Sequence, residues 1–183
     1  MRSDLDVVNF IKQQSGMMSQ LKAVESLSLP DCWIGAGFLR NTVWDALHSH
    51  ITGALLGDVD VVYFEAVNAN RGRDQKIEDL LRTICPNVPW SVKNQARMHL
   101  KNGDPPYTGT IDAMRNCPET ATAIAARSNG ALVELAAPYG VDDLLNMIVR
   151  PTPPFLKKMK QYDERLESKN WVARWPMVQV SLS

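Results

Sequence analysis

The chain has 183 residues, enough for one domain that buries its own apolar core, and it carries 20 basic and 20 acidic side chains. A net charge of zero gives no global attraction to nucleic acid or to an anionic membrane. No run approaches the roughly 20 apolar residues of a membrane span. The three cysteines are far apart and form no CxxC pair, which argues against a disulfide framework or a zinc knuckle. We therefore expect a soluble, cytoplasmic protein with reduced thiols.

The first part of the chain alternates between helical and strand patterns. Apolar residues at helical spacing predict short amphipathic helices over 5–14 and 17–27. The stretch "CWIGAGF" (32–38) is typical of a strand that runs into a glycine turn, and "RNTVWDALHSHI" (40–51) predicts a helix. The next strand is predicted in "LGDVDVVYFE" (56–65).

The second part of the chain predicts a similar mixture of elements. A helix over 74–84 has an apolar stripe made of Ile77, Leu80, Leu81 and Ile84. The remaining predictions are a strand over 90–100, a loop over 101–110, a helix over 118–127 that begins at a proline, a strand over 131–138, a short helix over 141–149 and an amphipathic helix over 155–169. We expect a single domain over 1–183, with a core over about 1–150 and a C-terminal helical extension over about 151–183.

Two carboxylates, Asp58 and Asp60, begin the strand predicted over 56–65. Side chains at i and i+2 of a strand point the same way, and two like charges about 4 Å apart repel by on the order of 4 kcal/mol at an effective dielectric near 20. A divalent cation between them reverses the sign of this energy, and magnesium prefers one or two carboxylates together with substrate phosphates. An isolated Asp-x-Asp is more often a turn cap and an exposed edge residue, so the neighbouring segment decides between the two interpretations.

That neighbouring segment is the glycine turn of "WIGAGFLRN". A glycine turn at a helix entrance lets backbone amides approach a phosphate, and the helix dipole adds attraction. Gly35 and Gly37 lie in this turn, and Arg40 is placed to pair with a phosphate or a carboxylate. A phosphate turn beside a carboxylate pair predicts a site for a nucleoside triphosphate with Mg²⁺ or Mn²⁺.

The combined segment, "WIGAGFLRN" followed by "GDVDVVYF", resembles the DNA polymerase beta type nucleotidyltransferase superfamily. The signature of that superfamily is a strand, a small-residue turn, a helix and a strand bearing Asp-x-Asp. The local form is similar to the tRNA nucleotidyltransferase pattern, which has an aspartate where this chain has Asn41. Over its whole length the chain is similar to a group of small bacterial nucleotidyltransferase-like proteins.

The resemblance implies a fold of the α/β class (α+β type), with a small mixed sheet flanked by helices. It also implies that Asp58 and Asp60 are the catalytic metal ligands and that Gly35 and Gly37 form the nucleotide-phosphate turn. Ala36 separates the two glycines, which in the superfamily pattern are adjacent small residues, so the register of the turn is open by one position.

Many superfamily members carry a third carboxylate on a later strand. The predicted strand over 90–100 has no acid, and Asn94 is its nearest equivalent, while Glu134 is the alternative. Lys93, Asn94 and Arg97 are candidate contacts for the triphosphate, with an ordinary solvent-exposed face as an equally good explanation. These residues complete the predicted substrate-binding set with Gly35, Gly37, Arg40 and Asn41.

The predicted function is the transfer of a nucleoside monophosphate from a nucleoside triphosphate to a hydroxyl of an unidentified acceptor, which is a small molecule, a protein or RNA. One alternative is a weak or inactive nucleotidyltransferase fold that only binds nucleotide, because no third acid is evident. The other is a dinucleotide-binding oxidoreductase, because "GAGFLR" matches the first two glycines of GxGxxG and Glu65 ends the next strand. Against the oxidoreductase, Arg40 replaces the third glycine.

Overall fold

The computed structural model describes residues 1–50 and 57–181, so the predicted element ends at Ile51 and Leu56 lie outside the described residues. The helices are α1 (Asp4–Gln13), α2 (Ser15–Glu25), α3 (Gly37–Leu47), α4 (Arg71–Ile84), α5 (Met98–Asn102), α6 (Thr110–Arg115), α7 (Asp142–Leu145), α8 (Met159–Lys169) and α9 (Trp171–Arg174). The strands are β1 (Trp33–Gly35), β2 (Val59–Tyr63), β3 (Trp90–Asn94), β4 (Ala125–Asn129), β5 (Leu132–Ala136), β6 (Ile148–Val149) and β7 (Gln179–Val180). The 3-10 turns are η1 (Gln95–Arg97), η2 (Thr120–Thr122) and η3 (Pro153–Lys157).

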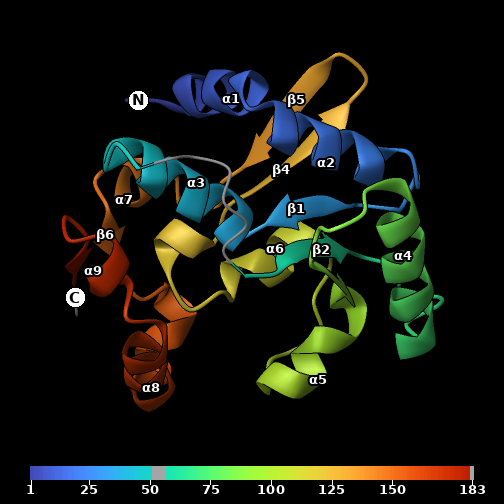
Figure 1. Cartoon of the computed structure of the whole chain (residues 1–183). Helices are drawn as coiled ribbons and strands as arrows, with labels where there is room; N and C mark the ends of the chain where they lie inside the picture. The colour runs from blue at the N-terminus through green and yellow to red at the C-terminus, as the bar shows by residue number, and fades with distance from the viewer. Residues whose placement is uncertain (51–56, 182–183) are drawn as a thin grey trace.

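A five-stranded mixed sheet in the order β3-β2-β1-β4-β5 forms the centre of the molecule. Strand β1 runs antiparallel to both β2 and β4, whereas β2 and β3 are parallel. Figure 1 shows α1 and α2 on one side of the sheet and α6 on the other. The predicted α/β class with a small mixed sheet flanked by helices is therefore confirmed.

The order of the strands also decides between two readings of the glycine turn. A dinucleotide-binding fingerprint requires the glycine turn to open a unit of two parallel strands joined by a helix. Here α3 instead joins β1 to an antiparallel neighbour, β2. The topology thus argues against the oxidoreductase alternative.

Alternation along β2 and β3 separates the two faces of the sheet. Val61, Tyr63 and Val92 are buried on the face covered by α2 and α4, while Asp60 and Lys93 point to the other face. The helices contribute buried apolar residues to that covered face, namely Val7, Ile11, Leu21, Val24, Ile77 and Leu81. Of the apolar stripe predicted on α4, Leu80 and Ile84 are instead about half exposed, at 54% and 50%.

The C-terminal segment is fastened to α3 by an aromatic cluster. The buried Trp44 side chain makes edge contacts with Trp171 and Trp175, at ring-centroid distances of 6.2 and 5.3 Å. In α8 the Tyr162 hydroxyl donates a hydrogen bond to the Val149 carbonyl (3.2 Å), and β7 pairs in parallel with β6. None of the helices in the described ranges is long and apolar enough to cross a membrane.

The free edge of β3 is closed by its own segment and by α4. The Trp90 N–H donates to the Val88 carbonyl (2.9 Å). The next two outward N–H groups donate to side chains of α4: Val92 to Glu78 (2.9 Å) and Asn94 to the Asp74 carboxylate (3.4 Å). These two carboxylates therefore accept the hydrogen bonds that a sixth strand would otherwise accept from β3.

Three predicted elements are wrong in whole or in part, and one of them is the helix over 141–149, which ends at Leu145 and is followed by β6. The helix predicted over 118–127 is the η2 turn followed by β4, because its last two alanines lie in the sheet, where Ala125 pairs with Gly35 and Ala126 with Ile34. The strand predicted over 90–100 ends at Asn94, because the Asn94 side chain accepts a hydrogen bond from the Ala96 N–H (3.0 Å) and begins the η1 turn. Helix α6, which covers the opposite face of the sheet, was not predicted.

Candidate functional site

The predicted acids lie at the start of β2, which is the second strand from one edge of the sheet. Asp60 is the second residue of β2, and its neighbours in register are Gly35 on β1 and Ser91 on β3. The side chain of Asp60 is 34% exposed, and Asp58, just before the strand, is exposed. The last residue of β1 therefore stands directly beside the acid-bearing strand, as the sequence pattern predicts.

The turn after β1 is strained at the residue between its glycines. Ala36 has φ 55° and ψ −120°, a combination that L-residues rarely adopt and that costs on the order of 1–3 kcal/mol. Its N–H donates to the Ile124 carbonyl of the segment leading into β4 (2.9 Å), which holds the strained residue in place. The positive φ of this turn thus belongs to Ala36 and not to either glycine.

The two glycines of this turn satisfy close approaches. A Cβ atom on Gly37 would stand 3.2 Å from the Asn41 amide nitrogen, and one on Gly35 would stand 3.4 Å from the Ile124 carbonyl oxygen. Helix α3 begins at Gly37, and among the described residues no side chain caps its N-terminus. An uncapped helix N-terminus presents backbone N–H groups and a positive dipole end, which is the arrangement that binds phosphate.

Two further polar side chains, Lys93 and Ser91, share the face of Asp60. The Lys93 ammonium lies 3.2 Å from an Asp60 carboxylate oxygen and donates to the Ser91 hydroxyl (2.7 Å). Sequence reasoning selected Lys93 but missed Ser91. The period-two spacing of 91 and 93 on one strand was the signal that could have found it.

Arg40 is close to the site but buried. Its guanidinium donates to the Thr122 hydroxyl (2.6 Å) and to the Asn41 side-chain oxygen (2.9 Å), and it lies over the Trp171 ring at 4.8 Å. Burial lowers the pKa of Arg40 to about 10, while the nearby Glu119 and Asp60 carboxylates act to raise it, so the side chain stays charged at neutral pH. This geometry favours an electrostatic and positioning role over the direct phosphate contact expected from the sequence.

Asn94 faces away from the acids. It has no exposed surface, and its amide holds the segment after β2 by accepting from the Glu65 N–H (3.1 Å) and donating to the Glu65 and Asn68 carbonyls (2.8 and 3.3 Å). These bonds favour a structural role for Asn94. Arg97, in the η1 turn, forms an ion pair with the buried Asp74 and is likewise on the α4 side of the sheet.

Glu134, the other candidate for a third carboxylate, is also distant from the acids. It lies on β5, three strands from β2 in the sheet order, which is about 14 Å at the usual strand spacing. Hydrogen bonds from Asn129 and Arg127 lower the pKa of Glu134 and hold its carboxylate at that edge of the sheet. Neither candidate stands beside Asp60, where the register position on β3 belongs to Ser91.

Sequence reasoning also missed Asp74, which is 4% exposed. It accepts hydrogen bonds from the Tyr63 hydroxyl (2.9 Å) and from Arg97. The pKa of Tyr63 is raised, mainly by burial of its hydroxyl and also by its hydrogen bond to Asp74. Its spacing from Ile77 and Leu81, at i, i+3 and i+7, places it on the buried face of α4 and was the available signal.

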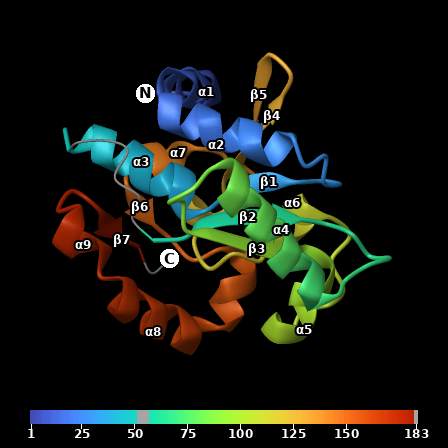
Figure 2. The ribbon, with the colours of Figure 1, turned by 45° about the vertical axis from the view of Figure 1, so that its right-hand side comes forward.

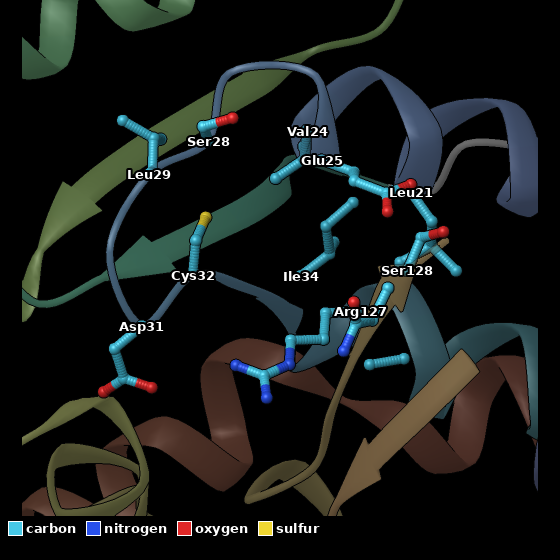
Figure 3. Close-up of a pocket in the computed structure, with 12 residues that line it drawn as sticks. Leu21, Val24, Glu25, Ser28, Leu29, Asp31, Cys32, Ile34, Arg127 and Ser128 are labelled. Atoms are coloured by element: carbon cyan, nitrogen blue, oxygen red, sulfur yellow. The ribbon is translucent and has the colours of Figure 1, made fainter. Parts of the chain in front are cut away.

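A cavity of about 290 Å³ lies elsewhere, between α2 and the β1–β4 part of the sheet (Figure 3). Figure 3 shows Cys32 between the loop bearing Ser28 and Leu29 and the strand residue Ile34. Burial raises the pKa of the Cys32 thiol to about 12, so it is inert at neutral pH. The two acids that line the cavity are hydrogen-bonded within the fold, because Glu25 accepts from the Gly130 N–H (2.5 Å) and Asp31 accepts from the Thr110 N–H (2.6 Å).

The residues around Asp60 suit a hard divalent cation that is completed by substrate. No cluster of three or more histidine, cysteine or acidic side chains able to hold a metal occurs in ranges 1–50 and 57–181. Magnesium commonly uses one or two carboxylates in this way when substrate phosphates supply its other ligands. The Lys93 ammonium beside Asp60 also shows that this carboxylate attracts positive charge in the present conformation.

Comparisons with solved structures agree with this geometry. A structure described as a CCA-adding enzyme head domain matches with 33% identity and a TM-score of 0.90, over 100% of this chain and 98% of that one. A tRNA-processing enzyme (14% identity, TM-score 0.55) and a CCA-adding enzyme in complex with ATP (13%, 0.55) share the fold. The first of these two matches covers 90% of this chain and 43% of the longer chain, and the second covers 99% and 42%. This chain therefore spans less than half the length of either protein.

Among curated proteins no match is found. The family model described as Nucleotidyltransferase matches residues 22–180, which include both the glycine turn and the acid-bearing strand. The chain therefore belongs to the nucleotidyltransferase family.

Proposed function

We propose that the protein is a metal-dependent nucleotidyltransferase that moves a nucleoside monophosphate from a nucleoside triphosphate to a hydroxyl group of an acceptor. The observation that carries this proposal is the register of Gly35 with Asp60. It sets the uncapped N-terminus of α3 beside the acid-bearing strand, so that one ligand can reach both. The CCA-adding enzyme of similar fold, described as a complex with ATP, supports a nucleoside triphosphate as that ligand.

In this proposal the residues of the chain bind and orient the triphosphate. The N–H groups at the start of α3 bind phosphate oxygens, and the buried Arg40 adds positive potential behind them. Asp58 and Asp60 hold Mg²⁺ or Mn²⁺, which when bound neutralises phosphate charge and favours ionisation of the attacking hydroxyl. Lys93, beside Asp60, offers a further cation toward the phosphates.

The reaction is a substitution at the α-phosphorus. A bond forms between the acceptor oxygen and the α-phosphorus, the bond to the β-phosphate oxygen breaks, and pyrophosphate leaves while the hydroxyl proton passes to solvent. Such a transfer depends mostly on positioning and charge neutralisation, which two carboxylates and a helix N-terminus supply.

The test is a transfer assay with each of the four α-labelled ribonucleoside triphosphates, Mg²⁺ or Mn²⁺, and cell extract as the source of acceptor, followed by mass analysis of labelled products. We expect a metal-dependent product that is absent with extract alone and with the Asp58→Asn/Asp60→Asn variant. Equal labelling by that variant would refute the assignment of the acids.

A second function, a nucleotide-binding module without catalysis, is favoured by one observation. The β3 position beside Asp60 is Ser91, so the third carboxylate that many superfamily members carry is absent from that position. The two functions separate in the same assay. Metal-dependent protection of the wild-type fold by a triphosphate, with no labelled product from any extract, would favour the binding module.

A further inference from the structure

A second cavity lies along the outer edge of β3. It has a volume of about 470 Å³ and lies between α4, β3 and the η1–α5 segment, and we call it the β3-edge groove. Figure 2 shows α4 and α5 at this edge of the sheet. Its charged lining residues are Arg71, Asp74, Glu78, Lys93, Arg97 and Lys101.

The two acids of the β3-edge groove are already engaged within the fold. Asp74 accepts from the Tyr63 hydroxyl and from Arg97, in addition to the β3 backbone. Glu78 accepts from the Val92 N–H and pairs with Arg82 at 3.1 Å. Asp74 therefore balances the charge of Arg97, whereas Glu78 pairs with Arg82, which lies outside the lining of the groove.

Two of the four cations form ion pairs, Lys93 with Asp60 and Arg97 with Asp74. Arg71 and Lys101 are exposed and have no ion pair within the described ranges. Arg97 pairs with Asp74 through one terminal nitrogen, while its other terminal nitrogen, Nη1, is buried and has no hydrogen-bond partner among the described residues. The groove thus carries an excess of positive charge and at least one unsatisfied buried donor, which is a ready site for an anion.

The β3-edge groove shares a wall with the site of the acids. Lys93 lines the groove, and its ammonium lies 3.2 Å from Asp60. Leu100, which is 77% exposed, adds an apolar surface at the outer part of the groove. A molecule held in the groove therefore has one end near Asp60 and room to extend outward along α5.

We propose that the β3-edge groove binds a phosphate group of the acceptor, so that the acceptor of the transfer is a phosphate-bearing molecule with a free hydroxyl. The inference rests on the proposed function, because it assigns the groove to the second substrate of the same site. Phosphate is the anion that best matches this lining, since guanidinium groups bind it through paired hydrogen bonds and lysines as point charges. A phosphomonoester of a small molecule and a phosphodiester of single-stranded RNA present the same chemistry.

The test uses two probes, ribose 5-phosphate and a fluorescein-labelled single-stranded hexaribonucleotide, with the full-length chain. The groove variant is Arg71→Glu/Lys101→Glu, and the matched control is Lys76→Glu/Lys160→Glu, which makes the same charge change at exposed positions outside the groove. Binding is followed by fluorescence anisotropy for the RNA and by thermal shift for the small phosphate.

We expect the groove variant to bind the preferred probe at least about tenfold more weakly than the control, and the salt slope for RNA to fall by about 1.4 for two lost phosphate contacts. Preference between the probes identifies the source of the phosphate. The proposal is overturned if the groove and control variants bind equally, or if neither probe binds the wild-type chain saturably.

Two further measurements keep this failure distinct from failure of the proposed function. Protection by ATP with Mg²⁺ is expected to be the same in both double variants, and Asp60→Asn is expected to retain probe binding. If probe binding depends on the groove but no nucleotide is transferred, the proposed function is refuted and the groove still stands as a phosphate-binding site. If both double variants transfer nucleotide to the acceptor equally well, the role of the groove is refuted and the proposed function is retained.

Discussion

Replacing Asp60 with asparagine should abolish transfer while leaving the fold almost as stable as before. The ion pair lost is the one between Asp60 and Lys93, whose charged atoms are 3.2 Å apart. At that distance the attraction is about 1 kcal/mol in bulk water and about 5 kcal/mol at an effective dielectric of 20. The two side chains are 34% and 42% exposed, so solvent screening reduces the net contribution to below about 1 kcal/mol.

The chain offers an internal control for this substitution in Asp45. The Asp45 carboxylate is buried and accepts from the Trp175 indole (2.9 Å) and from the Arg174 guanidinium (3.1 Å). Asp45→Asn keeps the shape but faces these donors with an amide, which should cost about 2–4 kcal/mol. Of the two isosteric substitutions, Asp60→Asn should therefore reduce transfer and spare stability, whereas Asp45→Asn should reduce stability and spare transfer.

Thermal unfolding and the labelled-nucleotide assay together measure both effects. We expect Asp60→Asn to change Tm by less than about 3 °C and to reduce transfer by on the order of 10³-fold, the equivalent of about 4 kcal/mol in the barrier. Asp45→Asn should lower Tm by about 5–15 °C and keep most transfer activity below its own Tm. The reasoning is refuted if Asp60→Asn keeps more than about a tenth of the activity, or lowers Tm as much as the control.

Three further predictions concern the remaining polar groups. Ser91→Asp should tighten Mn²⁺ binding by about tenfold in calorimetry, because it adds a carboxylate beside the acids, whereas Asn94→Asp on the opposite face should not; equal effects would contradict the register. Because the folded pKa of Glu134 is lowered, its ionised form stabilises the fold above its ordinary pKa near 4.3 and the benefit disappears as pH falls through the folded value. Glu134→Gln should therefore be less stable than wild type at pH 7 and equal to it near pH 2, and a difference that persists in acid would exclude this cause. Arg165→Met leaves the fully buried Glu119 carboxylate unpaired and should cost about 3–5 kcal/mol in urea unfolding, with Lys160→Met as the exposed control; a cost below about 1 kcal/mol would show that water compensates the charge.

The part of the site that sequence alone predicts is the part encoded locally. A strand, a glycine turn, a helix and a second strand bearing Asp58 and Asp60 follow one another within about thirty residues, and each has its own hydrophobic period. The register that sets Gly35 beside Asp60 then follows from the antiparallel pairing of two neighbouring strands. Consequently the position of the acids was predictable without a structure.

The parts that escaped prediction depend on contacts between distant residues. The segment 118–127 has a proline start and an alanine-rich composition, both typical of a helix, but pairing with β1 and β5 overrides that local preference. The burial of Arg40 depends on Thr122 and Trp171, which lie far along the chain. Likewise, Asn94 ends β3 through its own side chain, a choice that a period-two pattern does not reveal.

The closed edge of β3 limits how any partner can reach this protein. With the outward N–H groups of Trp90, Val92 and Asn94 already bonded, an extended peptide finds no donors there with which to continue the sheet. Recognition at this edge must therefore proceed through side chains. The same closure protects the sheet from edge-to-edge association between copies of the chain, because two carboxylates of α4 occupy the place where a foreign strand would add.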